Sequence, residues 1–127
     1  MLKIFLIALG GGIGSVLRYL VQGWTFKYFS TTFPLGVLVV NVSGCFAIGF
    51  FAGAWLTGPV MVREEYRAAI LIGVLGGYTT FSTFSWETLR LADANQLLAA
   101  AANIILSVAL GLVATWGGAR MAQAIYG

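Results

Sequence analysis

Four long apolar stretches alternate with short polar segments along this chain. Stretches of about 20 apolar residues are typical of helices that cross a bilayer. The pattern predicts four such helices, over about residues 2–22, 35–57, 65–91 and 95–121. Because the connecting segments are short, neighbouring helices are expected to be antiparallel and to form one transmembrane domain over residues 1–127. The expected fold class is therefore an all-α membrane protein.

Composition supports this fold class and excludes several functions. Of the 127 residues, 60% are hydrophobic and 9% are charged, more apolar surface than a small soluble domain can bury. The opening MLKIFLIALGGG lacks a signal-peptide cleavage site, so it is interpreted as the first span. With no histidine and four carboxylates, the chain has little material for an enzyme active site. Its single cysteine, Cys45, is expected to be a packed thiol.

The basic residues are almost evenly divided between the two ends of the predicted bundle. One end, with both termini and the middle loop, carries four of them: Lys3, Arg63, Arg67 and Arg120. The opposite end carries three: Arg18, Lys27 and Arg90. So small a difference gives almost no positive-inside bias. The chain is therefore expected to insert in both orientations, and two opposed copies could form an antiparallel dimer.

Small residues recur at four-residue spacing in each span. The pairs are Gly10 and Gly14, Gly49 and Gly53, Gly73 and Gly77, and Ser107 and Gly111. Such pairs let helix backbones approach closely in lipid. They predict helix packing and do not indicate a function.

Polar residues within the spans are candidates for function, because polar groups in hydrocarbon need a partner or water. Arg18 either extends its charge to the membrane interface or attracts anions to the mouth of a path. Asn41 either bonds a neighbouring helix or presents its amide N–H to a ligand. Asn103, Ser107 and Gly111 form a thin polar stripe that is either a helix contact or a pathway wall.

The third span contains the most unusual segment, GVLGGYTTFSTFSWE, residues 73–87. Its glycine pair and the threonines after it predict a break in the helix, whose freed carbonyls would suit a hard cation such as sodium. After the break, Phe81 and Phe84 share a helix face that hydroxyl side chains flank. Ring edges carry partial positive charge, so this arrangement predicts a site for a small anion. Packing of the two rings in a core is the alternative.

Three segments resemble the Fluc family of fluoride channels. They are GGYTTFSTFSWE (76–87), GGIGSVLRY (11–19) and PLGVLVVN (34–41). The resemblance covers the whole chain and implies a passive, fluoride-selective channel through which bacteria expel fluoride. It also implies an antiparallel, dual-topology homodimer in the inner membrane, with two pores and a broken third helix. Selection of fluoride over chloride follows only from the resemblance.

The resemblance also implies roles for individual residues. The fluoride pathway would be formed by Phe81, Phe84, Asn41, Ser107, Thr80, Ser82, Thr83, Glu87 and Arg18. The backbone carbonyls of Gly76 and Thr79 would bind a structural Na⁺ at the dimer centre, two from each subunit. Two positions depart from the resemblance: Asn103 lies where some members carry a tyrosine or histidine, and Tyr78 lies where other members carry a leucine.

Two other functions are less consistent with the sequence. A small multidrug transporter has the same size and span number, but proton-coupled cation export there needs a carboxylate in the first span. This first span carries Arg18 instead. A purely structural subunit would explain the glycine pairs but not the cluster of hydroxyls and rings from Thr79 to Ser85.

Overall fold

A computed structural model describes residues 1–127, and all of its regular structure is helical. The elements are α1 (Leu2–Tyr28), α2 (Leu35–Trp55), α3 (Glu64–Ala68), the π-helical η1 (Ala69–Val74), α4 (Leu75–Tyr78), α5 (Phe81–Asp93) and α6 (Leu97–Tyr126). Four helical stretches are long and apolar enough to cross a membrane: Leu2–Tyr28, Leu35–Trp55, Glu64–Asp93 and Leu97–Tyr126. The prediction of an all-α chain with four spans is confirmed.

The ends of the helices differ from the predicted boundaries. Helix α1 continues past residue 22 to Tyr28, and α6 continues past residue 121 to Tyr126. Neither extension contains a proline, so a helix that leaves the apolar layer has no reason to stop at once. Helix α2 ends at Trp55, two residues before the predicted end at residue 57.

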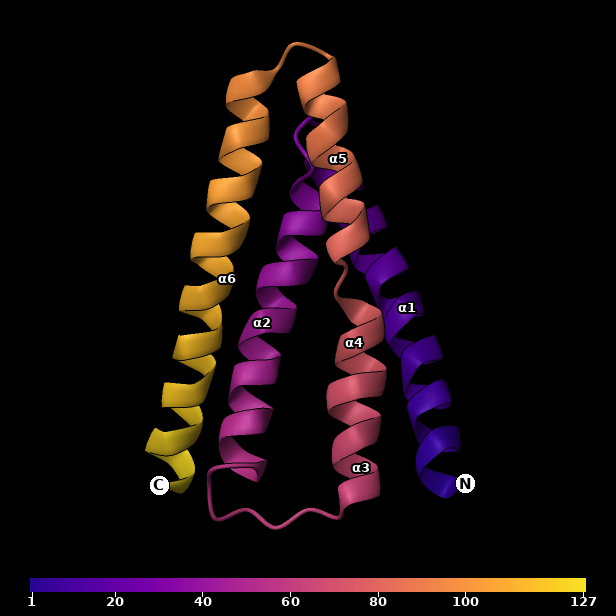
Figure 1. The fold of residues 1–127 in the computed structure, drawn as a ribbon, viewed down its shortest axis with the longest axis vertical. Coiled ribbons are helices and arrows are strands. Elements are labelled where there is room, and N and C mark those ends of the chain that lie inside the picture. Colours follow the sequence, from indigo (N-terminus) through magenta and orange to yellow (C-terminus); the bar gives the residue numbers. More distant parts are fainter.

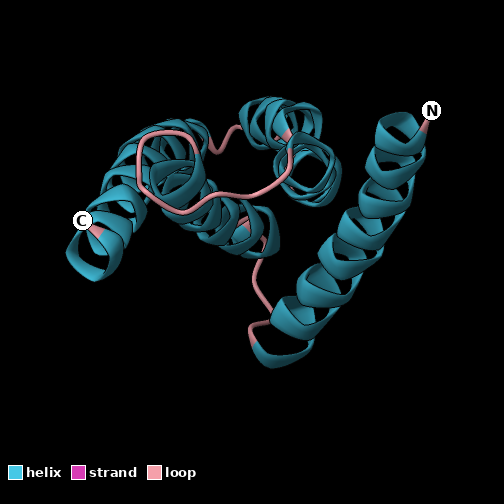
Figure 2. Ribbon diagram, turned by 90° about the horizontal axis from the view of Figure 1, so that it is seen from below, coloured by secondary structure: helices cyan, strands magenta, loops and turns pink.

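The helices lie side by side in the order α6, α2, α4 and α1 (Figure 1). Both termini and the α2–α3 connection lie at one end of the molecule, whereas the α5–α6 turn lies at the other. Seen from the end, α1 is separated from α6 by the remaining helices (Figure 2). Helix α1 packs mainly on η1 and α4, and α2 packs mainly on α6.

The α5–α6 turn is specified by a short hydrogen-bonded motif. Asn95 has a positive φ of 59°, a conformation that asparagine tolerates better than most residues. Its N–H bonds to the carbonyl of Ala92, and the N–H of Gln96 bonds to that of Leu91. These two bonds form the usual left-handed termination of a helix. The turn places α6 antiparallel to α5 (Figure 1).

Glycines allow α1 to lie directly against the third span. A Cβ atom on Gly10 would lie 2.5 Å from the carbonyl oxygen of Ala69, and one on Gly73 would lie 2.8 Å from that of Ile7. One on Gly14 would overlap the backbone of Val74. Because main-chain atoms cannot move away easily, these positions admit only glycine at this helix spacing. The packing role predicted for the glycine pairs is confirmed here.

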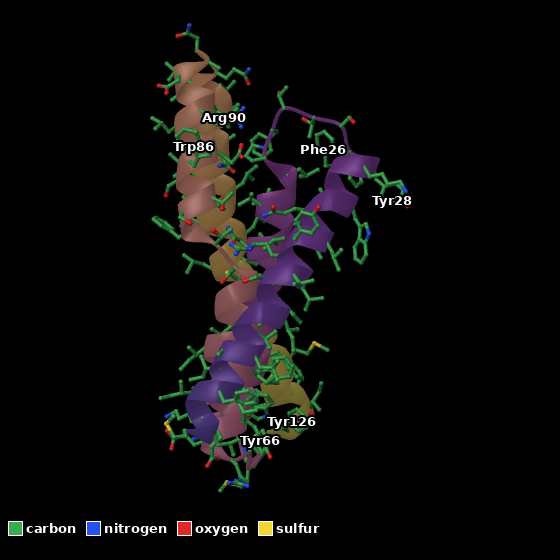
Figure 3. All side chains as sticks on the ribbon, turned by 90° about the vertical axis from the view of Figure 1, so that its right-hand side faces the viewer. Phe26, Tyr28, Tyr66, Trp86, Arg90 and Tyr126 are labelled. Atoms are coloured by element: carbon green, nitrogen blue, oxygen red, sulfur yellow. The ribbon has the colours of Figure 1, made fainter.

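Aromatic side chains occupy both ends of the bundle. Phe26, Tyr28 and Trp86 lie toward one end, and Tyr66 and Tyr126 lie toward the other (Figure 3). Tyrosine and tryptophan favour the boundary between hydrocarbon and water. Their distribution indicates that the helices cross a bilayer roughly along the long axis of the molecule.

Two adjacent glycines of α6 provide a test of this packing. A Cβ on Gly118 would overlap the carbonyl of Phe46 and lie 2.8 Å from the nitrogen of Phe50, whereas one on Gly117 would meet nothing within 4 Å. We expect Gly118→Ala to lower the free energy of unfolding by about 1–3 kcal/mol, the usual cost of overpacking. Gly117→Ala is the matched control and should not lower it. Unfolding by sodium dodecyl sulfate in detergent micelles measures both, and equal midpoints would contradict the close α2–α6 contact.

Candidate functional site

The site is centred on two residues of the third span that are not helical. Helix α4 ends at Tyr78, and α5 begins at Phe81. Between them, Thr79 (φ −82°, ψ 158°) and Thr80 (φ −150°, ψ 119°) have extended backbones. The preceding segment, Ala69–Val74, is π-helical. π-helical turns are rare in proteins, and those that occur often lie at functional sites.

Asn41 of α2 satisfies the backbone of Thr80. Its side-chain oxygen accepts a hydrogen bond from the N–H of Thr80 at 2.8 Å, and its amide nitrogen donates one to the carbonyl of Thr80 at 2.9 Å. Unpaired peptide groups are costly in hydrocarbon, so this reciprocal pair makes extended backbone possible at this depth. The second N–H of the Asn41 amide has no hydrogen-bond partner in the structure.

Thr80 also caps the next helix. Its hydroxyl accepts a hydrogen bond from the N–H of Thr83 at 3.2 Å, which satisfies one of the free donors at the start of α5. The hydroxyl of Thr83 lies 3.1 Å from it, and that of Ser82 lies 3.3 Å from it. Three hydroxyl groups are therefore grouped beside the non-helical residues.

The carbonyls of Gly76 and Thr79 lack the N–H donors that they would have in a continuous helix. The N–H that would bond the carbonyl of Gly76 in a continuous helix is that of Thr80, and it is directed to Asn41. No N–H bonds to the carbonyl of Thr79. Neutral oxygens of this kind are suitable ligands for a hard cation. The donor set therefore fits the sodium ion that the sequence resemblance implies.

A second contact from α2 supports Tyr78 and Thr79. The hydroxyl of Tyr78 lies 2.9 Å from that of Ser43, within hydrogen-bonding distance. A Cβ on Gly44 would overlap the methyl group of Thr79. Tyr78 thus has a specific partner here, which explains how this chain accommodates a tyrosine at that position.

A cavity of about 380 Å³ lies beside these residues and is lined by α2, the third span and α6. Seven of the predicted site residues line it: Asn41, Gly76, Thr79, Thr80, Phe81, Phe84 and Ser107. The rings of Phe81 and Phe84 have centroids 5.6 Å apart and are tilted by 48°. The remaining lining includes Gly44, Cys45 and Ile48. The cavity is therefore mostly apolar, with an amide and hydroxyls at its wall.

The other predicted site residues do not line this cavity. Ser82 and Thr83 contact Thr80, as described above. Glu87 lines a second cavity, of about 270 Å³, between the end of α1 and the start of α2. Its carboxylate lies 3.7 Å from the guanidinium of Arg90. Arg18 is half-buried on α1, makes no ion pair and lines neither cavity.

Sequence reasoning missed one polar network. Asn103 is 2% exposed, and its amide donates a hydrogen bond to the hydroxyl of Thr88 at 2.9 Å. That hydroxyl donates to the carbonyl of Phe84 at 2.8 Å. The polar stripe of the fourth span indicated Asn103, but nothing in the sequence identified Thr88 as its partner.

Comparison with known proteins places the chain in a family. The family model described as "CrcB-like protein, Camphor Resistance (CrcB)" matches residues 5–119. The chain belongs to this family. Relatives named "Fluoride-specific ion channel FluC" include those of Flavobacterium psychrophilum, 49% identical over 97% of this chain and 98% of the relative, and Solibacter usitatus, 46% identical over 96% and 99%.

A third relative of the same name, from Methylococcus capsulatus, is 47% identical over 96% of this chain. The chain spans 53% of that protein. The resemblance to the Fluc family is therefore confirmed, and all three relatives are named as ion channels.

Replacing Asn41 tests its role at the non-helical residues. Asn41→Leu keeps the size of the side chain but leaves both backbone groups of Thr80 unpaired, which costs roughly 1–3 kcal/mol. We expect faster hydrogen exchange at the N–H of Thr80 in the purified protein. Ser43→Ala is the control, since it removes a polar group from the same helix and leaves the Thr80 bonds intact. Exchange at Thr80 as slow as in the unaltered protein would contradict the assignment.

Proposed function

We propose that this protein is a fluoride channel that conducts fluoride passively out of the bacterial cytoplasm and so protects the cell from its toxicity. The observation that carries the proposal is the match over nearly the full length of two relatives named fluoride-specific ion channels. The four spans support a multi-pass membrane location, which we assign to the bacterial inner membrane.

The chemistry of the cavity beside Phe81 and Phe84 supports a small anion as its ligand. Ring edges of Phe81 and Phe84 offer weak positive charge, and Asn41 and Ser107 offer polar hydrogens. No basic side chain lines the cavity, so no fixed charge would hold an anion too tightly to leave. The polar groups compensate in part for the water that fluoride loses on entry.

The remaining pathway residues extend this site toward its two ends. Thr80, Ser82 and Thr83 form the hydroxyl group at the start of α5. Glu87 stands one turn beyond Thr83 on the same helix, beside the second cavity. Arg18, on α1, would attract anions from the water outside. In this proposal the anion passes from the hydroxyl groups to the rings.

We further propose that two copies assemble as an antiparallel dimer of dual topology, with two pores. The ring of Phe81 is 79% exposed in a single copy although it lines the cavity. Only 19 of 127 residues are buried, so much helix surface remains for a partner. The balanced distribution of basic residues removes the usual preference for one orientation. A second, inverted copy would close the cavity around the rings.

A sodium ion at the dimer centre would be held by the carbonyls of Gly76 and Thr79 from both copies. The carbonyl of Gly76 lacks its helical donor because the side chain of Asn41 accepts the N–H of Thr80. The carbonyl of Thr79 lacks its own because the hydroxyl of Thr80 accepts the N–H of Thr83. A bound cation would compensate their partial negative charge. In this proposal the ion is structural, and the interruption of the third span provides its ligands.

Substitution of the two rings tests the fluoride pathway. Phe81→Ile and Phe84→Ile keep an apolar side chain but remove the ring edges, at a stability cost of about 1 kcal/mol. In liposomes under a potassium–valinomycin clamp, the unaltered protein should release fluoride and not chloride, without proton or sodium coupling. Both variants should lose most fluoride efflux per dimer. Phe5→Ile, at a comparably exposed ring of α1, is the control and should conduct normally. Normal efflux in both folded variants, or equal chloride efflux, would refute the pathway.

Tagging one terminus tests the topology. Both termini lie at the same end of the molecule (Figure 1), so a cysteine added at the C-terminus, in a Cys45→Ser background, reports orientation. An impermeant thiol reagent applied to intact cells should label about half of the protein, since the two orientations are inserted without bias. Complete labelling or complete protection, with full labelling after lysis, would exclude dual topology.

A further inference from the structure

Helix α5 is held to α6 by one polar contact beyond its first turns. The amide of Asn103 donates to the hydroxyl of Thr88, which in turn donates to the carbonyl of Phe84. The hydroxyl of Ser107, which lines the cavity beside Phe84, lies 3.5 Å from the side-chain oxygen of Asn103. The network thus connects the α6 wall of the cavity to the backbone of a ring-bearing residue.

Thr88 lies on the same face of α5 as the two rings. Phe81, Phe84 and Thr88 have the spacing i, i+3 and i+7, which places them along one stripe of an α-helix. A partner that holds Thr88 therefore determines the direction in which this stripe points. Asn41 restrains the start of α5 through Thr80, and Asn103 restrains it nearly two turns later.

We propose that Asn103 and Thr88 are positioning residues that set the rotation of α5 about its axis and thereby the orientation of the Phe84 ring in the cavity. The proposal rests on the fluoride pathway described above, since it concerns how a pathway ring is held. Neither residue needs to contact the ion. A buried amide is costly unless it is well bonded. The amide of Asn103 makes its bond to Thr88, on the helix that carries the rings.

The alternative is a contact that only joins two helices. Hydrogen bonds between membrane helices contribute little to stability on average, so such a contact would have a small effect on stability alone. The two roles differ in what they change. A joining contact alters how much protein folds and assembles, whereas a positioning contact alters the ring and the flux in protein that is already assembled.

Four variants separate these roles. Thr88→Val has nearly the same shape without the hydroxyl, and Thr88→Ser keeps the hydroxyl. Asn103→Leu removes the partner on α6. Thr115→Val is the matched control, because the hydroxyl of Thr115 bonds only the carbonyl of Gly111 in its own helix.

The first readout is fluorine NMR of 4-fluorophenylalanine incorporated at residue 84 of the purified protein. We expect one narrow resonance in the unaltered protein, and a shifted or broadened one in Thr88→Val and Asn103→Leu. Thr88→Ser and Thr115→Val should retain the original resonance. An unchanged resonance in both Thr88→Val and Asn103→Leu would overturn the proposal, whatever the protein transports.

The second readout is fluoride efflux per assembled dimer. It should fall about tenfold in Thr88→Val and Asn103→Leu, as for a lost hydrogen bond near the upper end of its usual net range. The double variant should be no worse than either single one, because both break the same connection. Normal efflux in both single variants, with Phe84→Ile inactive, would refute this proposal alone. Normal efflux in Phe84→Ile would instead refute the pathway.

Discussion

Two hydrogen bonds between Asn41 and Thr80 are the constraint on which the rest of the site depends. Extended backbone inside an apolar span exposes peptide groups that lipid cannot satisfy. The Asn41 amide matches both groups of Thr80 at once, because it carries a donor and an acceptor side by side. Without that match both peptide groups of Thr80 would be unpaired in the apolar span, and the start of α5, which carries the rings, would lose this restraint.

Helix α2 acts as the frame for this arrangement. It presents Asn41 to Thr80, Ser43 to Tyr78 and Gly44 to Thr79, all within one turn. Its opposite contacts, through Gly49, bring the backbone of α6 close enough for a shared cavity. Small residues therefore act here less by flexibility than by allowing main chains to touch. The spacing of α2 and α6 therefore determines whether Asn41 can reach Thr80 and whether Asn103 can reach Thr88.

Much of the fold follows from the chain's apolar pattern, because a helix of fixed rise must match the bilayer thickness. The ends of α1 and α6 were missed, since a helix can continue beyond the hydrocarbon where no residue stops it. Phe81, Phe84 and Ser107 were identified by local spacing and by resemblance, and they do line one cavity. The two alternatives for Asn41 stayed open in the sequence. Its partner is 39 residues away, and only the packing of α2 on the third span brings them together.

Local spacing also failed to identify Thr88 as the partner of Asn103. The two are 15 residues apart across the α5–α6 turn, and their contact depends on the left-handed conformation of Asn95. The π-helical segment Ala69–Val74 was missed as well. Its sequence, AILIGV, is ordinary for an α-helix. Contacts that depend on how one helix is rotated against another cannot be predicted from the spacing of apolar and polar residues alone.

The most direct test of the central claim replaces the peptide N–H of Thr80 by an ester oxygen, leaving every side chain unchanged. Semisynthesis with the corresponding hydroxy acid removes the N–H that donates a hydrogen bond to the side-chain oxygen of Asn41. An ester at Leu98 is the control, because the N–H of this second residue of α6 has no carbonyl partner within its own helix and the change leaves both Asn41–Thr80 bonds intact. The account predicts that fluoride efflux per dimer falls steeply with the ester at Thr80 and little with the one at Leu98. Equal efflux from the two esters would show that the Asn41–Thr80 pair does not hold the conducting arrangement.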